Sequence, residues 1–179
     1  MSTSADLDLL SELIEIAPAA RKARICMQCG TCTGGCPSAR EMDFTPRQII
    51  HLVQLGEIDE AMRCGGIWAC LNCYTCTVRC PRDIKVSEIF EGLRTMAYQR
   101  NIAPQRDRAF HESFLKSVQS YGRVFEPAMM TSFSLKTNPF AMVKQAPLGI
   151  ALLRRGKMPL APHKSTGPKK IKRGFFGNK

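Results

Sequence analysis

The sequence lacks most of the features that mark a catalytic or membrane-spanning chain. No apolar run reaches the roughly 18 residues of a membrane helix, so we expect no membrane span. There is no glycine-rich dinucleotide fingerprint, no P-loop and no nucleophile elbow, and no motif therefore indicates a substrate pocket. The N-terminal region lacks the pattern of a secretion signal, because residues 5–16 carry four acids. These absences predict a soluble cytoplasmic protein.

Acidic residues are missing from the last third of the chain. Residues 127–179 hold eleven lysines and arginines and no acid, whereas residues 1–126 hold fifteen residues of each sign. The formal net charge of +11 therefore comes entirely from the C-terminal segment, which also contains six of the eleven prolines. This change of composition predicts a folded domain at 1–126 and a basic, partly extended segment at 127–179.

The basic C-terminal segment is open to four interpretations. It could dock along an acidic partner subunit, remain a disordered solubilising tail, attach to an anionic membrane surface or bind nucleic acid. Regularly interleaved aromatic residues, which would favour nucleic acid, are missing, since Phe175 and Phe176 stand alone. We therefore expect no nucleic-acid partner and favour docking on a partner subunit.

Apolar periodicity predicts a mostly α fold. Helices are expected at 5–16, 57–63, 85–100 and 104–121, and none of the sequence shows a convincing strand pattern. Another helix should begin after Thr45, because Thr45, Pro46 and Gln48 form a capping box with proline at the first position, and Gly56 can end it. Residues 138–155 could hold one or two short helices broken at Pro147.

Cysteine is the residue that the chain has in excess, with nine in 179 residues. In a reducing compartment clustered cysteines usually bind metal, and an odd number argues against a closed disulfide framework. Eight of them form two copies of the motif Cys-x2-Cys-x2-Cys-x3-Cys-Pro. The first cysteine motif contains Cys26, Cys29, Cys32 and Cys36, and the second cysteine motif contains Cys70, Cys73, Cys76 and Cys80.

This spacing suits a 4Fe-4S cluster, which needs one thiolate on each of its four irons. Three closely spaced cysteines let one loop hold three irons, and in two-cluster ferredoxins the fourth ligand comes from the other motif. The two motifs would therefore complete each other. By this logic Cys26, Cys29, Cys32 and Cys80 hold the first cluster, and Cys70, Cys73, Cys76 and Cys36 hold the second.

Zinc is the simpler alternative for clustered cysteines. Structural zinc sites use four ligands that usually come as two pairs, whereas each motif here supplies a triplet and a separate fourth cysteine followed by proline. We therefore favour two 4Fe-4S clusters. The ninth cysteine, Cys64, fits neither motif and is expected to be a buried thiol without a function in the chemistry.

Several segments resemble a known family. The stretches CMQCGTCTGGCP, TPRQII, IWACLNCYTCTVRCP and IKVSEIFEGLR are similar to the iron–sulfur C subunits of the methanogen heterodisulfide reductases, over about residues 20–125. More widely, helices between and after two such motifs resemble the α-helical ferredoxin domain. The resemblance implies a two-cluster α-helical ferredoxin domain with all eight ligand cysteines in place.

The resemblance also implies a role in an oxidoreductase complex. Electrons would leave a flavin-bearing iron–sulfur A subunit, which bifurcates them, and pass through this chain to a B subunit with CCG domains. The B subunit would reduce the disulfide of coenzyme M and coenzyme B in methanogenesis, and a hydrogenase or formate dehydrogenase would be associated. The chain has no Cys-Cys pair, so it is not itself the CCG subunit, and we expect no catalysis by the isolated chain.

Three other functions remain open. The chain could serve another flavin-linked oxidoreductase, such as a glycolate oxidase-like or sulfur-metabolism complex, with a different terminal acceptor. It could be a free-standing ferredoxin-like carrier that docks transiently. A cluster-dependent regulator that binds nucleic acid is the third, and only the charge of the C-terminal segment favours it.

Overall fold

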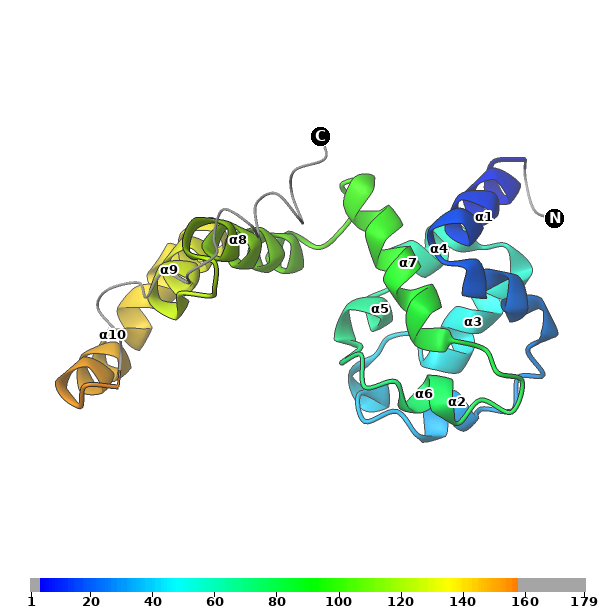
Figure 1. The fold of residues 1–179 in the computed structure, drawn as a ribbon, viewed down its shortest axis with the longest axis horizontal. Coiled ribbons are helices and arrows are strands. Elements are labelled where there is room, and N and C mark those ends of the chain that lie inside the picture. Colours follow the sequence, from blue (N-terminus) through cyan, green and yellow to red (C-terminus); the bar gives the residue numbers. More distant parts are fainter. Residues whose placement is uncertain (1–3, 158–179) are drawn as a thin grey trace. The chain divides into compact units, whose positions relative to one another are not determined.

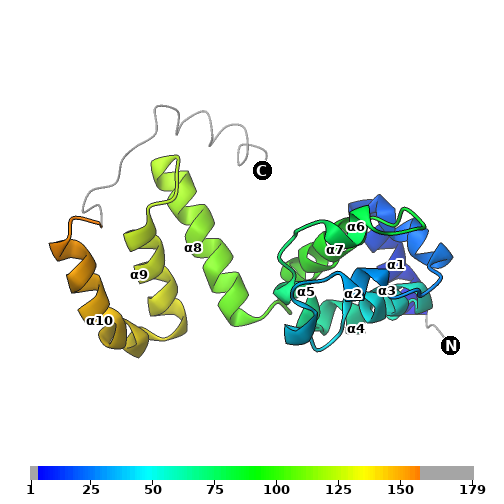
Figure 2. The same cartoon turned by 90° about the horizontal axis from the view of Figure 1, so that it is seen from below.

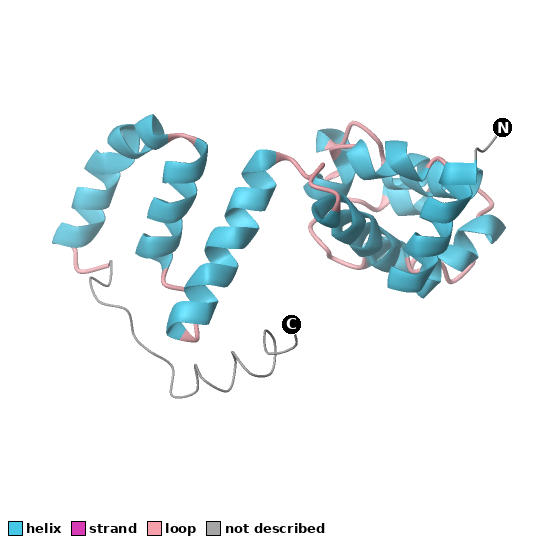
Figure 3. Ribbon diagram, turned by 90° about the horizontal axis from the view of Figure 1, so that it is seen from above, coloured by secondary structure: helices cyan, strands magenta, loops and turns pink. Residues whose placement is uncertain are grey.

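The computed structural model describes residues 4–157, and every regular element in this range is a helix (Figures 1 and 3). The mostly α class expected from the sequence is thereby confirmed. The chain divides into two compact units, residues 1–103 and residues 104–179. Within the described range no helix is long and apolar enough to cross a membrane.

The first unit contains both cysteine motifs. Its elements in chain order are α1 (Ser4–Ile16), the 3-10 helix η1 (Pro18–Ile25), α2 (Thr31–Gly34), the 3-10 helix η2 (Ala39–Glu41), α3 (Pro46–Leu55), α4 (Ile58–Arg63), α5 (Gly66–Ala69), α6 (Thr75–Val78) and α7 (Val86–Gln99). Helix α3 begins as predicted: the backbone N–H of Thr45 donates to the side-chain oxygen of Gln48 at 2.9 Å, and Gly56 ends the helix with φ +87°.

Helix α7 and the helices around it form the core of the first unit. The apolar face predicted for α7 is buried, and α7 packs on α1, α4 and α5. Gly92 lets α7 approach closely, because a Cβ there would lie 2.7 Å from the Cβ of Ala17. The largest fully buried side chains are Phe90, Leu13, Ile49, Ile50, Ile58, Met62, Ile67, Ile84, Ile89, Leu93, Met96 and Val53. Five cysteines of the two motifs pack against this core from partly buried positions, namely Cys26, Cys32, Cys70, Cys76 and Cys80.

Asp43 ties the loop before α3 to the start of α5. Its carboxylate accepts backbone N–H groups from Gly65 at 2.7 Å, Gly66 at 2.6 Å and Phe44 at 2.7 Å. Burial raises the pKa of the Asp43 carboxyl, but the three N–H groups lower it by more, so the pKa lies below its usual range. Because α5 runs directly into the second cysteine motif, Asp43 also fixes where that motif begins.

We expect Asp43→Asn to destabilise the chain at neutral pH by about 1–2 kcal/mol, as for the loss of a helix-capping side chain. A lowered pKa means that the stabilisation is present above the unfolded value of about 3.9 and is lost as pH falls through the folded value. Urea unfolding at a series of pH values should therefore show the difference from wild type shrinking in acid. Asp59→Asn is the control, since its exposed pair with Arg63 should contribute about 0.3–0.5 kcal/mol. Equal effects of the two substitutions at pH 7 would contradict the capping role of Asp43.

The described part of the second unit, residues 104–157, contains three successive helices (Figure 2). They are α8 (Gln105–Tyr121), α9 (Glu126–Thr137) and α10 (Pro139–Arg154), with α8 packed on α9 and α9 on α10. The contact between α8 and α9 uses small side chains: Ser113 donates to Ser132 at 3.2 Å, and Phe125 donates its N–H to Ser117 at 2.8 Å. Phe110 meets Phe133 edge-on with ring centroids 5.9 Å apart.

The structure divides the chain at residue 103, whereas the composition of the sequence divides it at residue 126. The difference arises because α8, which is rich in both signs of charge, packs on α9 of the basic segment. Helix α9 was not expected, and residues 139–154 form one helix that contains Pro147 instead of breaking there. Residues 126–137 and 139–154 are thus helical, while the most basic stretch, 158–179, lies outside the described residues.

Candidate functional site

The two cysteine motifs adopt the same backbone conformation. In the first motif Gln28 and Gly30 have positive φ angles of +56° and +80°, and in the second Asn72 and Tyr74 have +52° and +60° at the matching positions. Where neighbouring residues alternate between left-handed and right-handed backbone conformations, successive N–H groups turn toward one concave side. Such a concave side suits an anionic group such as an iron–sulfur cluster. A tyrosine tolerates this conformation poorly, so its presence at position 74 indicates that the loop shape is imposed by the surroundings.

Each motif then continues into a single turn of helix, and these two turns lie side by side. The turns are α2 in the first motif and α6 in the second (Figure 1). A Cβ on Gly35, after α2, would lie 3.5 Å from the side chain of Thr75 and 3.2 Å from that of Arg79. The two sites are therefore neighbours on the first unit.

One cavity joins the two motifs. It is lined by Cys70, Cys73 and Cys76 of the second motif together with Cys36 of the first, 34 positions earlier in the chain than Cys70. Tyr74, Met42, Pro46 and Phe90 are among the other residues that line it. The structure thus brings together the four residues predicted to hold the second cluster, and the ligation itself stays a prediction.

Two of the corresponding residues of the first motif lie near each other. Cys26 and Cys32 lie close enough for the charge of one to affect the other, and both pack against the core, as does Cys80. Gln28 donates its side-chain N–H to the Cys26 sulfur at 3.5 Å, while its own buried amide oxygen has no hydrogen-bond partner among the described residues. The fourth position of this site, Cys80, stays a prediction.

Four of the motif thiols, two in each motif, differ in their ease of ionisation. A hydrogen bond from the Thr31 hydroxyl lowers the pKa of the exposed Cys29, and Thr75 lowers that of Cys73 in the same way. Burial raises the pKa of Cys32 and raises that of Cys76 to about 11, with the charge of Cys70 adding to it. Partly buried thiolates of this kind become stable only beside a compensating positive charge.

These features fit a pair of 4Fe-4S clusters. The cavity is walled by four sulfur donors from two chain segments, none of the nine cysteines is in a disulfide, and the adjoining loops have positive φ angles of the kind that turns N–H groups toward an anion. Among the described residues, no three histidine, cysteine or acidic side chains are grouped closely enough to hold a single metal ion. The sulfur donors and the concave loops are the observations that support the fit.

The repeat extends beyond the cysteines to the threonines between them. Thr33 accepts the backbone N–H of Arg47 at 3.0 Å, and Thr77 accepts that of Ser87 at 3.2 Å. Each threonine therefore holds the first turn of the helix that follows its own motif, α3 or α7. Our reading of the sequence missed these residues, although the identical Thr-Cys-Thr in both motifs was a signal that could have found them.

Cys64 lies apart from both motifs. Its side chain is 4% exposed and its thiol donates to the carbonyl of Ala61 at 3.1 Å. Burial raises its pKa, which keeps the thiol neutral. The buried position expected from the sequence is confirmed.

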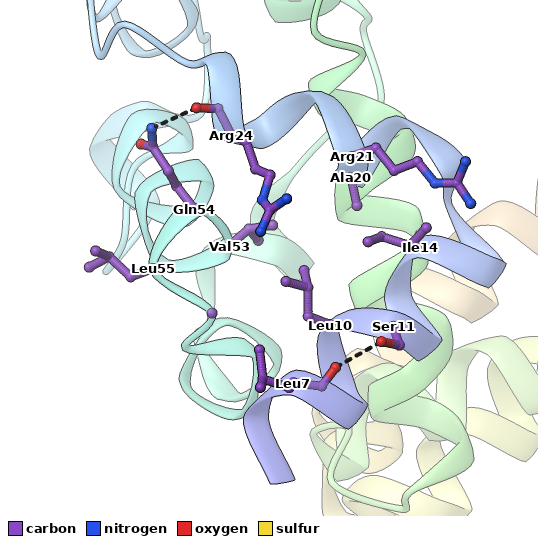
Figure 4. Close-up of a pocket in the computed structure, with 11 residues that line it drawn as sticks. Leu7, Leu10, Ser11, Ile14, Ala20, Arg21, Arg24, Val53, Gln54 and Leu55 are labelled. Carbon is purple, nitrogen blue, oxygen red and sulfur yellow. Dashed lines mark hydrogen bonds between the residues drawn. The ribbon is translucent and has the colours of Figure 1, made fainter. Parts of the chain in front are cut away.

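A larger open cavity of about 590 Å³ lies on the first unit between α1, η1 and the end of α3 (Figure 4). Leu7, Leu10, Ile14 and Val53 give it an apolar wall, and Arg21 and Arg24 give it positive charge. No cysteine lines it. The cavity therefore belongs to neither cysteine site.

Comparison with known proteins identifies the cysteine-rich region. Residues 22–84 match the family model of the 4Fe-4S dicluster domain. The chain is 45% identical over 80 residues to the iron–sulfur C subunit 2 of the CoB–CoM heterodisulfide reductase of Methanocaldococcus jannaschii, covering 45% of this chain and 42% of that one. It is 49% identical over 75 residues to the C2 subunit of the H(2)/formate:CoB-CoM heterodisulfide,ferredoxin reductase of Methanococcus maripaludis, covering 42% and 40%.

A third relative extends the similarity further along the chain. It is the iron–sulfur C subunit of the CoB–CoM heterodisulfide reductase of Methanopyrus kandleri, 37% identical over 107 residues, which are 57% of this chain and 55% of that one. The matches thus span about half the length of these curated relatives. Residues 22–84 are a 4Fe-4S dicluster domain with two 4Fe-4S clusters, and through this domain the chain is similar to the C subunits of the heterodisulfide reductases.

Proposed function

We propose that the chain is the electron-transfer subunit of a cytoplasmic heterodisulfide reductase complex. The observation that carries the proposal is the pair of neighbouring cysteine sites in a domain similar to the C subunits of these enzymes. When bound, the two clusters supply one-electron oxidation and reduction. The chain's own residues hold the two sites side by side and cover part of each with apolar side chains, so the protein offers separate entry and exit sites for electrons.

The partners follow from the same similarity. We propose that electrons come from a flavin-containing A subunit, in a complex that bifurcates them, and leave to a CCG-domain B subunit. That B subunit would reduce the disulfide of coenzyme M and coenzyme B, with a hydrogenase or formate dehydrogenase associated. The eight motif cysteines would hold the clusters in the crossed arrangement, with Cys80 completing the first and Cys36 the second. The chain itself would catalyse no step on the disulfide.

Anaerobic purification of the chain from its native cells tests this function. We expect a flavin-containing subunit and a CCG-domain subunit to purify with it, and the complex to reduce the coenzyme M–coenzyme B disulfide. A chain that elutes alone with its clusters intact would be a mobile carrier, and the subunit role would be wrong. A flavin protein without a CCG subunit would instead indicate a different terminal acceptor.

The second unit is suited to hold the chain in such a complex. Helix α10 exposes apolar side chains to solvent, with Phe140 82%, Leu148 64% and Ile150 55% exposed. Basic residues follow at its end, including Arg154 and Arg155, and the rest of the basic segment continues from there. We propose that α10 and the basic residues after it dock on an acidic partner subunit, with the exposed apolar side chains giving affinity and the charge giving steering.

Deleting residues 139–179 should release the chain from its partners. Since both cysteine motifs lie in the first unit, we expect an unchanged iron content but loss of co-purification, which can be measured by pull-down at increasing salt. Deleting only 158–179 is the matched control for the most basic stretch, and should weaken binding mainly at low salt, where its charges are least screened. If the chain without residues 139–179 retained all its partners, the proposed docking role would be wrong.

A further inference from the structure

The two cysteine motifs receive different side chains at one equivalent position. Gln54 of α3 and Arg94 of α7 each stand eight residues after the first residue of their helix. Gln54 donates its side-chain N–H to the carbonyl of Cys26 at 3.2 Å. It also donates to the carbonyl of Arg24 at 3.3 Å, the bond drawn in Figure 4. Arg94 donates Nη2–H to the carbonyl of Cys70 at 3.1 Å and Nε–H to that of Ile67 at 2.6 Å.

The repeat is therefore the same in geometry but not in charge. In both halves the side chain binds the carbonyl of the first cysteine of its motif and one carbonyl shortly before it. In the first half the donor is a neutral amide, whereas in the second it is a guanidinium, which stays protonated at any physiological pH. Arg94 is partly buried, and within residues 4–157 it forms no ion pair that would neutralise it.

Other charges near the motifs should contribute less to a difference in reduction potential between the two sites. Arg24, Arg47, Arg79 and Arg82 are exposed, so water and salt screen them. Lys85 is also exposed and lies 4.0 Å from the carboxylate of Glu88. On the first site, Gln28 directs an amide N–H at the Cys26 sulfur, which favours a reduced cluster, but a neutral dipole acts more weakly than a full charge in a partly buried position.

We propose that Arg94 makes the site of Cys70, Cys73, Cys76 and Cys36 the electron-accepting end of the chain. A fixed positive charge beside this site stabilises an added electron, and the neutral Gln54 gives the other site no such help. One electron then leaves the cluster held by Cys26, Cys29, Cys32 and Cys80, which is oxidised, and reduces the cluster of the second motif. No proton moves and no bond changes. This direction of electron flow rests on the proposed electron-transfer function. Arg94 contributes only its fixed positive charge and takes no part in a chemical step.

Redox titration of the full-length chain, followed by electron paramagnetic resonance, tests the proposal directly. We expect two reduction potentials, and the higher one should belong to the site of the second motif. A Cys36→Ala chain, which should lack that site, shows which of the two potentials disappears and so assigns them. Arg94→Gln should lower the potential of the second site by at least about 59 mV, which for one electron is a tenfold loss of affinity. The potential of the first site should stay unchanged. Arg94→Lys keeps the charge and should retain most of the potential.

The reciprocal variant separates charge from structure. Gln54→Arg should raise the potential of the first site, and the double exchange of Gln54 and Arg94 should reverse the order of the two potentials. Arg79→Gln is the control for an exposed charge and should shift neither potential by as much. If Arg94→Gln loses the second cluster altogether, Gln54→Arg decides: an unchanged first potential overturns the proposal. A chain that binds no cluster at all would instead overturn the proposed function.

Discussion

Replacing Cys36 with alanine is expected to remove the cluster of the second cysteine motif, although Cys36 belongs to the first motif. The reason is spatial: Cys36 lines the same cavity as Cys70, Cys73 and Cys76. A 4Fe-4S cluster that loses a thiolate ligand is exposed to solvent and to loss of iron. The iron content should fall from about eight to about four per chain, with one of two sets of spectroscopic signals disappearing.

The converse variant shows whether the ligands are crossed. Cys80→Ala should remove the other set of signals and leave the cluster of the second motif in place. Cys64→Ala is the matched control, since this buried cysteine donates to the Ala61 carbonyl and should leave the iron content unchanged. If instead Cys36→Ala abolished the signals that depend on Cys26, Cys29 and Cys32, each motif would complete its own cluster and the crossed arrangement would be wrong.

A methyl group at position 66 is expected to have the largest effect on folding. The Cβ of an alanine at Gly66 would lie 2.2 Å from the backbone oxygen of Phe44 and 3.1 Å from the side chain of Ile49. A backbone oxygen in a packed loop cannot move aside as a flexible side chain can, so the helix start or the loop must shift. We expect Gly66→Ala to lower the free energy of unfolding by about 3 kcal/mol, at the upper end of the cost of overpacking.

The neighbouring glycine supplies the control for this experiment. The atoms nearest to a Cβ at Gly65 would be those of the Asp43 carboxylate, at 3.3 Å, and Gly65 has a φ of −67° that alanine adopts freely. Gly65→Ala should therefore change stability by less than about 1 kcal/mol. Thermal unfolding of both variants, followed by circular dichroism without oxygen, measures the difference. Equal midpoints for the two variants would show that the Phe44 loop yields to the added methyl group.

Much of the first unit could be predicted because its helices carry their own signals. Regular apolar spacing indicated α1, α4 and α7, as it did α8 of the second unit, and the capping sequence at Thr45 indicated where α3 begins. The short turns α2 and α6 could not be foreseen, because each has only four residues and no apolar periodicity. Helix α9 was hidden for a related reason: none of its described residues is buried, so no apolar face marks it.

The sequence indicated the cysteines of the candidate site but not the residues around them. Spacing alone indicated the eight cysteines, and the structure places Cys36 with the second motif. Gln54 and Arg94 gave no signal, since the segment between motif and helix differs in length. Helix α3 begins ten residues after Cys36, whereas α7 begins six residues after Cys80, so a search at the spacing of the motifs would not align the two side chains. Only the folded backbone shows that they are equivalent.

The cavity shared by the two motifs also has a consequence for the order of events during synthesis. The chain is made from its N-terminus, so Cys36 leaves the ribosome before Cys70, Cys73 and Cys76, which line the same cavity. Until the second motif emerges, the residues that line the other side of the cavity are missing. Iron delivered to a half-made chain would meet an incomplete set of donors. Productive loading of this cavity must therefore wait until translation has passed the second motif.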